Sequence, residues 1–68
     1  MKVTLNGKIT ALEGQCSLTE ILRQAAVPLD QGGVAVAVND RVVARASWDE
    51  IALNEGDRIE VIHAVQGG

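Results

Sequence analysis

Aromatic and basic residues are scarce in this 68-residue chain. Trp48 is the single aromatic residue, and Phe and Tyr do not occur. Proteins that bind single-stranded nucleic acid stack the bases on several aromatic side chains. This chain lacks such an aromatic stacking surface. Six Lys and Arg stand against nine Asp and Glu, which gives a formal net charge of −3. This balance argues against a phosphate-binding surface, and we expect no nucleic-acid partner.

Cysteine and long apolar runs are scarce as well. Cys16 is the single cysteine, which excludes an intramolecular disulfide and a zinc site built from several cysteines. No apolar run approaches the roughly 20 residues of a membrane-spanning helix, and the N-terminus lacks the apolar stretch of a signal peptide. We therefore expect a cytoplasmic protein with no membrane partner. Without disulfides, the domain depends on its aliphatic core for stability.

The first half of the chain has the pattern of a β-hairpin followed by a helix. Apolar and polar residues alternate from Lys2, and Asn6-Gly7 favours a type I′ turn, in which both central residues need positive φ. Residues 8–13 are the expected returning strand. Residues 17–20, Ser-Leu-Thr-Glu, form a capping box. They begin a helix of roughly ten residues that Pro28 is expected to end, and its apolar face consists of Leu18, Ile21, Leu22, Ala25 and Ala26.

The second half predicts three strands and one helical turn. Residues 34–38, Val-Ala-Val-Ala-Val, form a strand away from the sheet edge, with the valines in the core and Ala35 and Ala37 on a smooth outer face. A short strand covers 41–44, a single helical turn starts at Ser47, and Trp48 fills the edge of the core. The last strand covers 58–65. Ile59 and Val61 face the core, so Ile62 and Ala64 join the outer face.

This order of elements predicts an α+β fold. An antiparallel hairpin followed by a helical crossover gives a mixed sheet of four to five strands with one helix packed across it. The arrangement that fits is the ubiquitin-like β-grasp. We expect one domain over residues 1–65 and a flexible Gly-Gly tail over residues 66–68.

The sequence contains no recognisable catalytic or metal site. Cys16 as a nucleophile would need a base such as His63 beside it, and no pattern brings the two together. A buried apolar role at the helix entrance explains Cys16 more simply. The acidic residues near 49–50 and 55–57 have the pattern of solvated turns. We therefore expect no metal, no bound cofactor and no enzymatic activity of the chain itself.

The C-terminal Gly67-Gly68 pair is the exception. Without Cβ atoms, both residues can pass through a narrow channel and adopt backbone angles closed to other residues. Extended, residues 64–68 span roughly 16–18 Å, which can deliver the terminal carboxylate into the active site of another protein. That carboxylate becomes a good electrophile only once it is activated, for example by joining it to AMP, and nothing in this sequence binds ATP.

The sequence resembles the ThiS family, the sulfur carrier proteins of thiamine biosynthesis, over nearly its whole length. The resemblance rests on Asn6-Gly7, on Trp48, on the stretches at 17–22, 34–39, 42–45 and 56–60, and above all on the ending Ala-Val-Gln-Gly-Gly at 64–68. Several family members carry Pro where this chain has Ala44.

The resemblance implies a reaction sequence and its partners. An adenylating enzyme of the ThiF type would use ATP to activate the Gly68 carboxylate. Sulfur drawn from cysteine through a desulfurase would convert it to a thiocarboxylate, and thiazole synthase (ThiG) would consume that sulfur. Gly67 matches the second glycine of the family. The docking face for both partners would consist of Ala35, Ala37, Ile62, Ala64, Val65 and Gln66.

Three alternatives are compatible with the residues. The MoaD family, the sulfur carriers of molybdopterin synthase, shares the fold and the Gly-Gly end, but its members tend to be longer and to carry Pro before the glycines. A ubiquitin-like modifier would be joined to lysines and would form conjugates of high molecular weight. A non-covalent binding module would keep its partners after Gly67 and Gly68 are removed.

Overall fold

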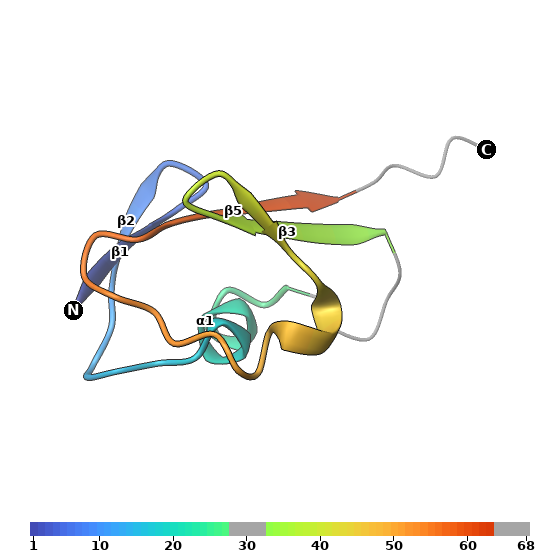
Figure 1. Ribbon diagram of the computed structural model, residues 1–68. Coiled ribbons are helices and arrows are strands. Elements are labelled where there is room, and N and C mark those ends of the chain that lie inside the picture. The colour runs from blue at the N-terminus through green and yellow to red at the C-terminus, as the bar shows by residue number, and fades with distance from the viewer. Residues whose placement is uncertain (28–32, 64–68) are drawn as a thin grey trace.

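One α-helix crosses one face of a five-stranded sheet in the computed structural model, which describes residues 1–27 and 33–63 (Figure 1). The elements follow in the order β1 (Lys2–Leu5), β2 (Lys8–Ala11), α1 (Leu18–Gln24), β3 (Val34–Val38), β4 (Arg41–Val43), a 3-10 turn (Arg45–Ser47) and β5 (Arg58–His63). The strands lie in the spatial order β2-β1-β5-β3-β4. The mixed sheet with one helix packed across it is confirmed.

Strand β5 lies at the centre of this sheet. It pairs in parallel with β1 and antiparallel with β3, while β1 and β2 form the expected hairpin. Asn6 and Gly7 have φ values of 49° and 81°, as a type I′ turn requires. Strand β2 ends at Ala11, two residues before the predicted end, although Leu12 still exchanges backbone hydrogen bonds with Met1 and is buried in the core.

Helix α1 begins as predicted but ends earlier. The Ser17 hydroxyl accepts a hydrogen bond from the Glu20 N–H, which confirms the N-cap. The helix has seven residues because Ala26 adopts a left-handed φ of 59°. The N–H groups of Ala26 and Val27 then donate to the carbonyls of Arg23 and Leu22, as in a Schellman motif. The prediction that Pro28 ends the helix was wrong, and Ala25 and Ala26 are exposed rather than part of the apolar face.

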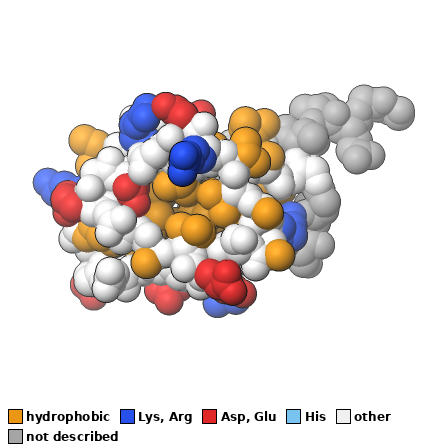
Figure 2. All heavy atoms as spheres, viewed as in Figure 1, with side chains coloured by type: hydrophobic (Ala, Val, Ile, Leu, Met, Phe, Trp, Pro, Cys, Tyr) orange, Lys and Arg blue, Asp and Glu red, His pale blue; other side chains and the backbone are white. Residues whose placement is uncertain are grey.

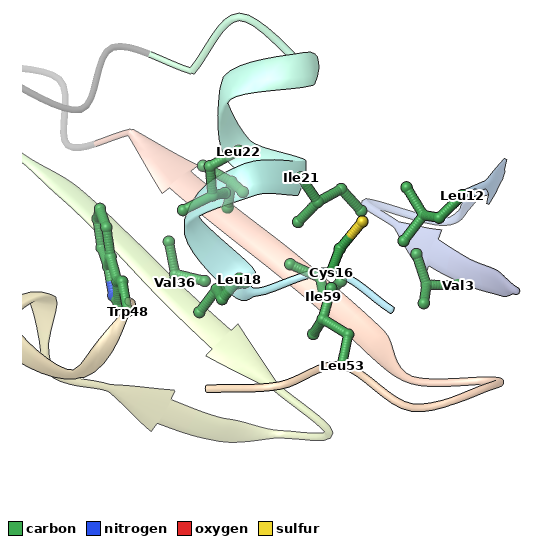
Figure 3. Packing of buried hydrophobic residues seen from close by; sticks show 11 residues of the cluster. Val3, Leu12, Cys16, Leu18, Ile21, Leu22, Val36, Trp48, Leu53 and Ile59 are labelled. Atoms are coloured by element: carbon green, nitrogen blue, oxygen red, sulfur yellow. The ribbon is translucent and has the colours of Figure 1, made fainter. Parts of the chain in front are cut away.

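The core lies between α1 and the sheet (Figure 3). It is aliphatic except for Cys16 and Trp48. The indole N–H of Trp48 donates to the Val43 carbonyl at 3.0 Å. This contact places Trp48 at the end of the core beside β4, as expected. The buried cluster consists of Val3, Leu12, Cys16, Leu18, Ile21, Leu22, Val36, Trp48, Leu53, Ile59 and Val61.

The connection from β4 to β5 closes the core on the helix side. The helical turn starts at Arg45, two residues earlier than predicted, and β4 ends at Val43 instead of residue 44. Leu18 N–H donates to the Ile51 carbonyl and Leu53 N–H donates to the Cys16 carbonyl, at 2.9 and 3.0 Å. These two bonds hold the connection against the helix entrance, and Leu53 is fully buried there.

Candidate functional site

The strand that leads to the C-terminus is held in the sheet from both sides. His63, the last described residue of β5, pairs with Val34 of β3. The sequence-predicted site residues Gly67 and Gly68 lie outside the described residues, as do Ala64, Val65 and Gln66 and the predicted domain boundary after residue 65. The structure therefore defines the point from which residues 64–68 start.

Asn39 and Asp57 fix the start of β5 against β3. Asn39 donates its backbone N–H to the Arg58 carbonyl at 2.8 Å, and its side-chain Oδ1 accepts from the Arg58 N–H at 3.0 Å. The Asn39 Nδ2 group donates to Asp57 Oδ1, and Asp57 Oδ2 accepts from the Asn54 N–H. These four hydrogen bonds come from the turn after β3 and the turn before β5. Together they fix where β5 starts relative to β3.

Asn6 holds β5 on the opposite side. Its backbone N–H donates to the Ile59 carbonyl at 2.8 Å, and its side-chain Oδ1 accepts from the Val61 N–H at 2.8 Å. The side chain thus continues the ladder between β1 and β5 past the end of β1. The Asn6-Gly7 pair predicts a turn and nothing more, because no local pattern indicates a bond to a residue 55 positions later.

The face of the sheet away from α1 carries exposed apolar residues. Ala35 lies opposite Ile62, and Ala37 lies opposite Val42 on one side and Glu60 on the other. Directly opposite residues of paired strands share a face. The side chain of Ile62 is 58% exposed and that of Val42 is 80% exposed. We call Ala35, Ala37, Val42 and Ile62 the outer patch.

The outer patch adjoins the C-terminal end of β5. In Figure 2 hydrophobic side chains reach the sheet-side surface at the top of the view, near that end of the strand. Ala35, Ala37 and Ile62 were singled out from the sequence. Val42 was missed, because β4 is only three residues long and shows no alternation from which its outward face could be inferred.

Cys16 has none of the properties of a reactive thiol. Its side chain points into the core at the entrance to α1 (Figure 3) and is 7% exposed. Burial, followed by the neighbouring Glu20 carboxylate, raises the pKa of the thiol above its ordinary value. Because the thiolate is the nucleophile, the environment of Cys16 keeps it unreactive near neutral pH.

Two further kinds of feature do not occur among residues 1–27 and 33–63. No three His, Cys, Asp or Glu side chains lie close enough together to hold a metal ion. No helix in these ranges has the length and apolar character to cross a membrane.

Comparison with known proteins gives consistent matches over the whole chain. The model of the ThiS family matches residues 3–68. The sulfur carrier protein ThiS of Thermus thermophilus is 38% identical over 66 residues, which are 97% of this chain and 98% of that protein. The crystal structure of thiamine biosynthesis protein ThiS from Geobacter metallireducens is 30% identical, with a TM-score of 0.82 and full coverage of both chains.

Some of the relatives are much longer proteins. The thiazole synthase of Paramagnetospirillum magneticum is 29% identical over 68 residues, which are all of this chain but only 20% of that protein. This chain therefore spans one fifth of the length of that relative. That relative, named a thiazole synthase, contains a region similar to the whole of this chain.

Burial of Cys16 predicts a pH dependence of stability. Because its pKa is raised in the folded chain, the thiol proton stabilises the fold fully below the unfolded pKa, near 9.0, and this contribution is lost as the pH rises through the folded pKa. The free energy of unfolding, measured with urea as the pH is raised past 9.0, should fall more steeply for the wild type than for Cys16→Ala. Parallel pH profiles would contradict this assignment.

Proposed function

This chain belongs to the ThiS family, and from that premise we propose that its Gly68 carboxylate carries sulfur, as a thiocarboxylate, for thiazole formation in thiamine biosynthesis. The observation that carries the proposal is the family match through residue 68, together with a sulfur carrier relative of nearly the same extent. The chain itself is the carrier on which the partner enzymes act.

The chemistry of the terminal glycines supports this role. A carboxylate is a poor electrophile, so an adenylating enzyme of the ThiF type is proposed to transfer AMP from ATP to Gly68. Sulfur that a desulfurase takes from cysteine, reduced to the sulfide level by a thiol, then attacks the Gly68 carbonyl. AMP leaves with one oxygen of the former carboxylate, and a thiocarboxylate remains. Gly67 and Gly68 present no Cβ, so both faces of the Gly68 carbonyl remain open to the attacking sulfur.

Thiazole synthase is the proposed acceptor of the sulfur. The relative from Paramagnetospirillum magneticum is named a thiazole synthase and contains a region similar to this entire chain. Such an arrangement brings a carrier-like region and a synthase together in a fixed ratio. We propose that this chain and thiazole synthase come together in the same way, and that Gly68 is delivered to the active site of the synthase.

The outer patch is the proposed docking surface for thiazole synthase. It lies on β3, β4 and β5, and β5 continues directly into the segment that ends at Gly68. A partner that covers Ala35, Ala37, Val42 and Ile62 would therefore receive the last residues beside its contact area. Ala64, Val65 and Gln66 complete the predicted docking face.

Thiocarboxylate formation is the test of the proposed function. The full chain is incubated with the adenylating enzyme of its own organism, ATP and a sulfur source, and its intact mass is measured. We expect the mass shift of one oxygen replaced by sulfur, located on Gly68 by fragmentation. The control variant lacks Gly68 and should remain unmodified.

An unchanged mass in the presence of an adenylating enzyme that modifies a known carrier would contradict the proposal. Conjugates of high molecular weight that require Gly68 would instead support a ubiquitin-like modifier. Deletion of the gene separates the two sulfur pathways, because a thiamine requirement favours the ThiS role and a molybdopterin defect favours the MoaD role.

If the outer patch is the docking surface, substitutions at two exposed isoleucines should affect the affinity for thiazole synthase differently. Ile62 lies in the outer patch, whereas Ile9 is 72% exposed on β2, at the far edge of the sheet. Ile62→Glu should weaken binding to thiazole synthase by about tenfold or more, as expected for a central contact residue, and Ile9→Glu serves as the matched control. Calorimetric titration measures both affinities. Equal effects of the two substitutions would contradict the assignment.

A further inference from the structure

Strand β5 extends beyond its neighbour on one side. Strand β1 pairs with β5 only through Thr4 and Leu5, opposite Arg58 and Ile59. On the other side, β3 accompanies β5 to its last residue, His63. Figure 1 shows the same offset, since β5 runs on past the β1–β2 hairpin and ends beside β3.

The direction of the backbone groups along β5 follows from its hydrogen bonds. Asn39 and Arg58 form a hydrogen-bonded pair with β3, so in an antiparallel ladder the alternate pairs with Glu60 and Ile62 are hydrogen-bonded too. The residues in between direct their N–H and C=O groups toward β1. Two bonds confirm this direction: Asn6 N–H donates to the Ile59 carbonyl, and Val61 N–H donates to Asn6 Oδ1.

Asn6 is the last described residue that bonds to β5 on this side. The ladder there ends at the Val61 N–H, although β5 continues for two more residues. No residue among 1–27 and 33–63 pairs with the Val61 carbonyl or the His63 N–H on this side, so within the described part of the chain both groups point to an open edge, directly before residues 64–68. An unpaired edge of this kind is a template for an additional strand.

The composition of the C-terminus makes backbone pairing the available means of recognition. Gly67 and Gly68 have no side chains, so an enzyme can orient them only through their peptide groups and the terminal carboxylate. A partner strand that pairs with Val61 and His63 could continue the same pairing along residues 64–68. On this basis, and resting on the proposed function, we propose that an extended segment of thiazole synthase adds to the open edge of β5 at Val61 and His63 and so guides the last residues into its active site.

Proline at position 63 provides the test. The His63 N–H is not used by β3, so His63→Pro removes the donor at the open edge without removing a bond of the sheet. His63→Ala is the matched variant, since it also loses the imidazole but keeps the N–H. We expect His63→Pro to bind thiazole synthase from the same organism at least about tenfold more weakly than His63→Ala, with closely similar urea midpoints.

Ile62→Pro tests the assigned direction of the strand. Its N–H belongs to the hydrogen-bonded pair with Ala35, so this substitution should lower the urea midpoint well below that of His63→Pro. A midpoint for His63→Pro as low as that of Ile62→Pro would overturn the proposed geometry.

Amide hydrogen exchange of the unmodified chain gives a second, independent measurement. In the free protein the Ile62 N–H should exchange slowly and the His63 N–H quickly. Addition of thiazole synthase should slow exchange at His63. Binding of the wild type with no protection of His63, or equal affinities of His63→Pro and His63→Ala, would overturn this inference alone. No binding of the wild type would overturn the proposed function and this inference with it.

Discussion

The central position of β5 is the constraint on which the rest of the structure depends. The strand lies between β1 and β3 and is the last described element before residues 64–68. Asn39 and Asp57 hold its start against β3, and Asn6 holds its middle from the side of β1. These side chains supply hydrogen-bond partners to the backbone of β5 where the neighbouring strands turn away. The position of His63, from which the chain continues to Gly68, follows from this arrangement.

The small core and the exposed surface serve different purposes. Helix α1 and the inner face of the sheet bury almost only aliphatic side chains, with Cys16 and Trp48 among them. That core stabilises the domain, while its thiol stays protonated and unreactive. The outer patch remains exposed over β3, β4 and β5. In the proposed function partner enzymes bind the folded domain, and the chemistry takes place at Gly68.

Local signals in the sequence predicted the elements but not all of their ends. Asn6-Gly7 and the Ser17 cap are short-range features, so the hairpin and the helix start were predicted correctly. The prediction of the helix end was wrong, because Ala26 adopts a positive φ that is uncommon for alanine and ends the helix before Pro28. The bond from Val61 to Asn6 joins residues far apart in the chain, and no local pattern contains it. For the candidate site, the alternation in β3 and β5 identified Ala35, Ala37 and Ile62 but not Val42.

The central claim is that Gly68 of this chain hands sulfur to thiazole synthase. The most direct measurement is a single turnover with isolated thiocarboxylated chain, free of the adenylating enzyme and ATP, mixed with thiazole synthase and its other substrates. We expect sulfur to leave Gly68 and to appear in the thiazole product, one equivalent at most per chain. A thiocarboxylate that persists while thiazole forms at the same rate without the chain would contradict it.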